Sequence, residues 1–117
     1  MLLQVIMQKK IKSIKKELNL NKNNYIYIEK NFFTKENFDL FDNCLDNKKT
    51  IIAFKKNSNS QLLSLLKNIR NSFAHGNFFL KGNTFVLWTI SPNKNLLLLI
   101  VMSQQKFNIL MKQLKMQ

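Results

Sequence analysis

Along the first eighteen residues, apolar side chains recur every three or four positions, which is the spacing of one face of an α-helix. The members of this stripe are Leu3, Met7, Ile11, Ile14 and Leu18. Lysines lie mostly on the other faces, at positions 9, 12, 15 and 16. Such a helix either packs on a core with a solvated lysine face or lies on a membrane surface, and core packing is the commoner use.

Two further amphipathic stretches each follow a residue that suits the N-cap position of a helix. Thr34 precedes an apolar stripe of Phe38, Phe41 and Leu45. Cys44 borders this stripe and is expected to be a small buried residue rather than a nucleophile. Ser103 precedes the last predicted helix, whose stripe consists of Phe107, Leu110, Met111 and Leu114.

Another predicted helix, third in chain order, covers residues 61–75, "QLLSLLKNIRNSFAH", with Ser58 or Ser60 as its N-cap. Gly76 follows, and glycine is usual in the left-handed position after a helix C-terminus. The predicted core-facing stripe is Leu62, Leu66, Ile69 and Phe73.

Other segments favour strands. "NTFVLWTI" and "NLLLLIVM" flank the turn-forming "SPNKN" at residues 91–95, which predicts a β-hairpin before the last helix. Residues 25–33 alternate like a strand but equally suit the start of a helix. Residues 51–54 form a short apolar segment whose type the pattern leaves open.

The charge is strongly asymmetric. The net charge is +13, and all six carboxylates precede residue 47. From residue 47 onward there are ten lysines, one arginine and no carboxylate. This basic part would attract a polyphosphate such as RNA, although the lysine-rich codon usage of an AT-rich genome would produce the same excess.

Composition limits the remaining classes of function. The one cysteine cannot form an intrachain disulfide, and the first residues lack the features of a secretory signal, so a cytoplasmic location is expected. The longest apolar run, residues 96–102, is too short to span a membrane. Glu36, Asp39 and Asp42 share one helix face, but a solvated face is a commoner arrangement than a metal site. We expect neither a metal nor a cofactor.

The only arginine and the only histidine, Arg70 and His75, lie five residues apart in "NIRNSFAHGNF". On an ideal helix His75 lies roughly 140° from the middle of the core stripe, Asn71 about 180° and Arg70 about 80°. Asn71 and His75 therefore form an i, i+4 pair on the exposed face, within reach of the long Arg70 side chain. His75 could simply cap the helix dipole, but a guanidinium in a lysine-rich chain suggests bidentate binding of phosphate.

The order Arg70, Asn71, three residues, His75 resembles the R-N-x-x-x-H motif of the HEPN superfamily, the higher eukaryote and prokaryote nucleotide-binding domains. The resemblance implies a helical bundle. Together with the predicted β-hairpin, which is not part of the general bundle of the family, it leads us to expect a mainly α fold: a single HEPN-like domain over residues 1–117 with the hairpin inserted before the last helix. It also implies a homodimer that joins two motifs, and metal-independent endoribonuclease activity in a toxin or in antiphage defence. Arg70 and His75 would be the catalytic pair and Asn71 an auxiliary polar residue.

Cleavage of RNA by this motif is chemically coherent, because the 2′-OH of RNA is its own nucleophile. A neutral His75 imidazole could accept the 2′-OH proton while Arg70 stabilises the phosphorane charge. One histidine cannot be acid and base in the same step, which independently favours a dimer if the chain is an enzyme. Lys67 and Lys81 would hold the RNA backbone.

Trp88 or Phe78 could stack a base, although burial is the commoner role of such residues. The main alternative is a non-catalytic HEPN-like dimer that binds nucleic acid or a partner protein. A third reading is a basic protein that lies on membranes through its first helix. An antitoxin or another regulatory partner is compatible with the nuclease hypothesis.

Overall fold

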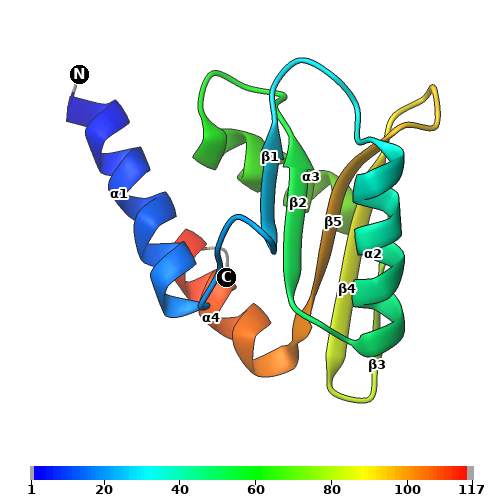
Figure 1. Cartoon of the computed structure of the whole chain (residues 1–117). Helices are drawn as coiled ribbons and strands as arrows, with labels where there is room; N and C mark the ends of the chain where they lie inside the picture. Colours follow the sequence, from blue (N-terminus) through cyan, green and yellow to red (C-terminus); the bar gives the residue numbers. More distant parts are fainter. Residues whose placement is uncertain (1, 116–117) are drawn as a thin grey trace.

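The computed structural model describes residues 2–115, which form four helices and one five-stranded sheet (Figure 1). The helices are α1 (Leu2–Glu17), α2 (Lys35–Asn47), α3 (Gln61–Ala74) and α4 (Gln104–Leu114). The strands are β1 (Tyr25–Ile28), β2 (Ile51–Lys55), β3 (Phe78–Lys81), β4 (Thr84–Ile90) and β5 (Leu96–Ser103).

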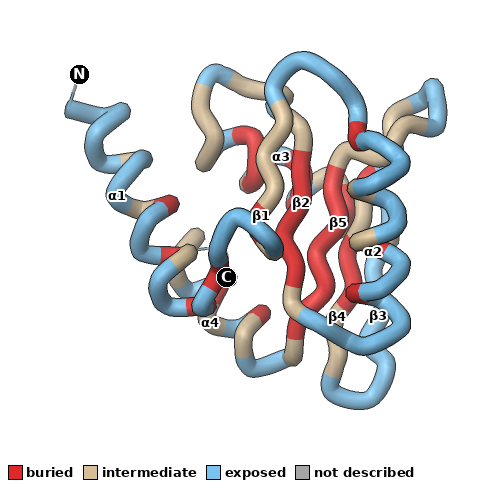
Figure 2. Tube along the Cα trace, in the orientation of Figure 1, coloured by how far each residue is buried: buried red, intermediate tan, exposed pale blue. Residues whose placement is uncertain are grey.

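The strands lie in the order β1-β2-β5-β4-β3, with β1 and β2 parallel and the other neighbours antiparallel. Because side chains alternate along a strand, each central strand contributes to both faces of the sheet. Ile52 and its partner Ile100 contribute to one core, whereas Ile51 and its partner Val101 contribute to the other. Both faces of the central strands are therefore buried, and Figure 2 shows β2 and β5 as the most continuously buried segments.

The helices cover the two faces unequally. α1, α3 and α4 pack on one face around Ile14, Phe54 and Leu110, which are all fully buried. α2 alone packs on the opposite face, through Phe41 and Cys44. The result is an α+β arrangement with the sheet as its middle layer (Figure 1).

The expected mainly α bundle is therefore wrong. All four predicted helices and the β4–β5 hairpin are present, but residues 25–28 and 51–55, whose type the pattern left open, are strands. Since β1 and β2 join the hairpin and β3 in one sheet, α2 is separated from the other three helices by that sheet. A helical bundle contains no paired strands, whereas residues 25–28 and 51–55 pair with neighbouring strands and their side chains alternate between the two faces of the sheet.

The ends of three helices follow the sequence signals. Thr34 caps α2: its Oγ1 accepts the Asn37 N–H at 3.2 Å while Asn37 Oδ1 accepts the Thr34 N–H at 2.9 Å. Of the two candidates before α3, Ser60 is the N-cap, and its Oγ accepts the Leu63 N–H at 3.0 Å. Ser103 caps α4 in the same way.

The apolar stripes are only partly buried as predicted. In α1, Ile11 and Ile14 are buried, as is Leu18 directly after the helix, which confirms core packing for the C-terminal half. Leu3, by contrast, is 63% exposed. In α2, Phe41 and Cys44 are buried while the other two stripe residues, Phe38 and Leu45, are largely exposed. In α4, Phe107 and Leu110 are buried and the rest of the stripe is half-buried. No helix in the span 2–115 is long and apolar enough to cross a membrane.

Candidate functional site

The buried face of α3 is more polar than its sequence suggests. Leu65 and Ile69 are fully buried, but so are Ser64, Asn68 and Ser72, which follow one another at intervals of four residues. The predicted stripe was wrong in part, because Leu62, Leu66 and Phe73 are only half-buried. A polar spine, defined here as Ser64, Asn68 and Ser72, thus lies against the sheet where the apolar pattern predicted hydrocarbon.

Hydrogen bonds to neighbouring backbone and side chains satisfy the polar spine. Ser64 Oγ accepts the Asn57 N–H at 3.1 Å. Asn68 donates through Nδ2 to the Lys55 carbonyl at 3.1 Å, and its Oδ1 accepts from Asn57 Nδ2 at 3.1 Å. These bonds attach α3 to the end of β2 and to the loop that follows it.

The C-terminal part of α3 is attached to the sheet in the same manner. Thr89 on β4 donates its hydroxyl to the Asn68 carbonyl at 2.8 Å, and Ser72 Oγ donates to the Asn77 carbonyl at 2.7 Å. Ring contacts add to these bonds, since Phe73 and Phe78 have their centroids 5.1 Å apart. The helix end is therefore tied to β3 and β4 by both polar and aromatic contacts.

A Schellman motif terminates α3. The Gly76 N–H donates to the Phe73 carbonyl at 3.1 Å and the Asn77 N–H to the Ser72 carbonyl at 2.8 Å. Gly76 has a φ of +69°, the left-handed value that this motif requires. The predicted helix end at Gly76 is confirmed, and the motif leaves His75 as the C-cap residue, with its backbone N–H bonded to the Asn71 carbonyl at 3.0 Å.

Arg70, Asn71 and His75 lie on the last turns of this anchored helix. Arg70 and His75 are exposed, as predicted. Asn71, which the ideal helix placed opposite the core stripe, is half-buried, because α3 buries its Ser64, Asn68 and Ser72 side in place of the predicted stripe. Within residues 2–115 no hydrogen bond or ion pair engages any of the three side chains. They are therefore available to a ligand, and helical geometry alone fixes their relative positions.

The two lysines expected to bind substrate differ in their relation to the motif. Lys67 is exposed one turn before Arg70 and Asn71 on the same helix, so it lies on their side of α3. Lys81 is exposed at the far end of β3, about 10 Å beyond Phe78 along the strand. The fold thus groups Lys67 with the motif more closely than Lys81.

The candidate stacking residues lie on opposite faces of the sheet. Phe78 is 41% exposed on the face that carries α3, where it stacks on Phe85 with a centroid distance of 6.3 Å. Trp88 is half-buried in the core beneath α2 and contacts Phe79 at 5.9 Å between centroids. Of the two, Phe78 is the one adjacent to the motif helix.

The other chemically active side chains are separate from the motif. Cys44 is buried on the side of α2 that faces the sheet, as expected, and burial raises the pKa of its thiol. Glu36, Asp39 and Asp42 are all exposed on α2. Across residues 2–115 no three histidine, cysteine, aspartate or glutamate side chains are grouped so that they could hold a metal ion.

Comparison with family models places these observations in context. The model described as HEPN pEK499 p136 matches residues 1–116, almost the whole chain. The chain belongs to this HEPN family. Neither the curated proteins nor the solved structures contain a match to it.

Membership agrees with the resemblance carried by Arg70, Asn71 and His75, and with a nuclease or other nucleic-acid-related role for a HEPN protein. The residues that sequence reasoning missed are those of the polar spine, together with Thr89. Their signal was present as serine, asparagine and serine at intervals of four, but such spacing is equally typical of a solvated helix face.

Proposed function

We propose that this HEPN protein is a metal-independent endoribonuclease in which Arg70, His75 and Asn71 act on the RNA phosphate. The observation that carries the proposal is the position of these three side chains, unpaired within the described chain, at the anchored end of α3. RNA needs no external nucleophile, because its 2′-OH is adjacent to the scissile phosphate.

In the proposed reaction a neutral His75 imidazole accepts the 2′-OH proton while the 2′-oxygen bonds to phosphorus. The Arg70 guanidinium stabilises the negative charge that grows on the phosphoryl oxygens. The bond from phosphorus to the 5′-oxygen then breaks, and this oxygen takes a proton from an acid. The products are a 2′,3′-cyclic phosphate and a 5′-hydroxyl.

The acid requires a second imidazole, since each chain contains one histidine. We propose that a symmetric homodimer brings two motifs to one RNA groove, so that one His75 is the base and the partner's His75 is the acid. Asn71 would orient the phosphate or the partner's groups by hydrogen bonding. A role as toxin or antiphage effector is part of the same proposal.

The distribution of charge favours approach of RNA from the side of α1, α3 and α4. Four of the six carboxylates lie on α2, on the opposite face of the sheet: Glu36, Asp39, Asp42 and Asp46. α3 carries Lys67 and Arg70 and no carboxylate. Repulsion by α2 and attraction by the basic helices would orient a polyanion toward the motif.

The decisive experiment incubates purified protein with RNA in EDTA and maps the new ends. We expect 2′,3′-cyclic phosphate ends with the unchanged protein, and at least a hundredfold loss of cleavage in both His75→Ala and Arg70→Lys. Lys94→Gln, on the β4–β5 turn, is the matched surface control and should cleave normally. Circular dichroism and urea titration establish that each variant is folded.

Cleavage that survives both substitutions would remove these residues from the proposal. Salt-sensitive RNA binding with no cleavage by any preparation would favour the non-catalytic alternative, because lysines alone suffice for counterion release. The dimer is tested separately by measuring the mass of the protein in solution with light scattering. A monomer that cleaves RNA would refute the two-histidine mechanism.

A further inference from the structure

The first turns of α1 are exposed although they are rich in apolar side chains. Leu2, Leu3, Val5 and Ile6 are between 43% and 77% exposed, and the first buried residue of the helix is Ile11. Figure 1 shows this end of the helix standing apart from the sheet, and Figure 2 shows it as exposed. The four exposed apolar residues are called the apolar tip.

Most of the apolar tip lies on the opposite side of α1 from the core. On an ideal helix Leu2, Val5 and Ile6 lie roughly 110° to 150° from the centre of the buried side. Ile11 and Ile14 define that buried side. Packing of α1 on α3 and α4 therefore cannot cover these three side chains, and a cluster of exposed apolar residues of this kind is typical of an interaction site.

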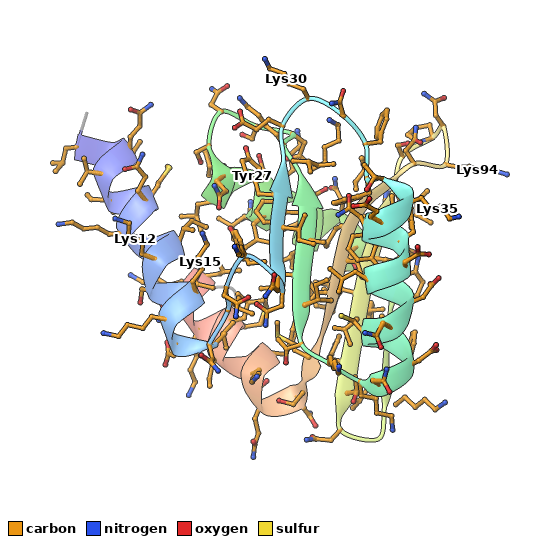
Figure 3. All side chains as sticks on the ribbon, viewed as in Figure 1. Lys12, Lys15, Tyr27, Lys30, Lys35 and Lys94 are labelled. Carbon is orange, nitrogen blue, oxygen red and sulfur yellow. The ribbon has the colours of Figure 1, made fainter. Side chains whose placement is uncertain are left out.

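Lysines follow the apolar tip on the same outward side of the helix. Lys9, Lys12 and Lys16 are all exposed and lie roughly 130° to 170° from the buried side on an ideal helix. Within residues 2–115 no ion pair engages them, and Figure 3 shows Lys12 directed away from the sheet. Glu17, the one carboxylate of α1, is at the far end of the helix from the tip. The outward side of α1 thus changes from apolar to positively charged within about two turns.

This order of side chains matches the profile of an anionic lipid surface, where hydrocarbon lies beneath charged headgroups. At 1.5 Å per residue the apolar tip is about 6 Å long, and Lys9 and Lys12 follow about 5 and 9 Å beyond Ile6. Helices at membrane interfaces bury their apolar part to a depth of roughly 5 to 10 Å. The tip can therefore reach the acyl chains while the lysine ammonium groups stay at the level of the phosphates.

Other partners fit this surface less well. A stable protein interface involves roughly 20 to 30 residues on each side, whereas the apolar tip has four. Two copies packed through their tips would bring their lysines together, and each chain has a net charge of +13. RNA would bind the lysines but would leave the apolar tip in water.

We propose that α1 attaches the protein to anionic membrane surfaces. The apolar tip inserts among the acyl chains, and Lys9, Lys12 and Lys16 bind the phosphate groups of the lipids. This attachment goes beyond the proposed RNA cleavage, because it uses neither Arg70 nor His75.

Co-sedimentation of the full chain with lipid vesicles tests the role of charge. Vesicles of phosphatidylcholine and phosphatidylglycerol in equal amounts should bind the protein at least tenfold more tightly than vesicles of phosphatidylcholine alone. Replacing the three outward lysines of α1 together by glutamine should weaken binding to the anionic vesicles at least tenfold. A control triple variant, which removes the same charge from exposed positions elsewhere, should weaken it less than threefold (Figure 3). The control consists of Lys30→Gln, Lys35→Gln and Lys94→Gln.

The role of the apolar tip has its own variants. Leu2→Gln/Ile6→Gln should weaken binding to the anionic vesicles at least tenfold, and glutamine preserves the helix because its helix propensity is high. The control Leu80→Gln/Ile90→Gln replaces two side chains that are each 48% exposed on the sheet, and should change binding less than twofold. The chain has one tryptophan, Trp88, which is half-buried on the α2 side of the sheet. Lipids with brominated acyl chains should therefore quench the fluorescence of Ile6→Trp but not that of the unchanged protein.

Equal weakening by the two lysine variants would overturn the proposal, since it would indicate general attraction to a basic protein. Unchanged binding of Leu2→Gln/Ile6→Gln, or unquenched Ile6→Trp, would refute insertion of the tip. Equal binding to both kinds of vesicle, or to neither, would also overturn the proposal. If Leu2→Gln/Ile6→Gln instead halved the mass measured by light scattering, the tip would be a contact between two copies and the membrane site would be refuted. His75→Ala should bind vesicles normally, so this test is independent of RNA cleavage.

Discussion

Replacing Asn68 by alanine tests whether the polar spine holds the motif helix. The Asn68 side chain is fully buried and makes two hydrogen bonds of 3.1 Å, to the Lys55 carbonyl and from Asn57 Nδ2. Each lost bond should cost about 1 kcal/mol. The stranded partners add a penalty, while the better helix propensity of alanine returns about 0.5 kcal/mol. We expect a net loss of about 2 kcal/mol.

Urea unfolding of the unchanged protein and the variant measures this loss. Asn108→Ala is the matched control, because Asn108 is exposed on α4 and its replacement should be neutral or stabilise by up to about 0.5 kcal/mol. A double-mutant cycle with Asn57→Ala should give a coupling energy of about 0.5 to 1 kcal/mol. A loss below about 0.5 kcal/mol for Asn68→Ala, or no coupling to Asn57, would refute the reasoning.

Two further predictions concern single positions. Gly76→Ala should destabilise by about 1 kcal/mol from backbone strain alone, because φ is +69° and an added Cβ meets no atom within 4 Å. Gly82→Ala, with φ of +59° and equally open space, should cost the same in urea unfolding, and a much larger loss at Gly76 would contradict the open surroundings. Cys44 should react with iodoacetamide at least a hundredfold more slowly in the folded protein than in urea, because burial shields the thiol and raises its pKa. Equal rates in the folded and unfolded protein would contradict the burial of Cys44 between α2 and the sheet.

Local signals in the sequence were sufficient to predict where the helices begin and end. Thr34, Ser60 and Ser103 are N-caps because a side-chain oxygen there meets a free backbone N–H in the first turn, which depends only on neighbouring residues. The same holds for Gly76, whose left-handed conformation ends α3. The β4–β5 hairpin also forms between adjacent segments.

Predicting the sheet required knowledge of pairing between distant segments, which no short stretch of sequence contains. β1 and β2 are four and five residues long. They are strands because β1 pairs with β2 and β2 also pairs with β5, which lies more than forty residues further along the chain. Short apolar runs suit a helix or a strand equally until such partners are known. The expected bundle failed for this reason, although the four helices that would have built it are present.

The polar spine explains why the core stripe of α3 was misassigned. Apolar periodicity assumes that buried positions carry apolar side chains. Ser64, Asn68 and Ser72 are buried because the end of β2 and the loops before and after α3 offer polar groups that need partners. The helix is consequently rotated from its predicted orientation. Arg70 is exposed because it flanks the predicted stripe and lies opposite the polar spine, and His75 is exposed because it is the C-cap residue at the end of α3.

In the candidate site, local structure sets the arrangement of the motif residues and the fold sets their surroundings. The relative positions of Arg70, Asn71 and His75 depend on the helix and its Schellman end, and they would be the same in a bundle or on a sheet. The fold decides only what faces them, and in this chain Arg70 and His75 face solvent while Asn71 is half-buried. A solvated guanidinium stabilises charge weakly, since water screens it at short range. Efficient cleavage therefore requires that water be displaced from the motif by a second surface, which the proposed partner motif and the bound RNA would provide together.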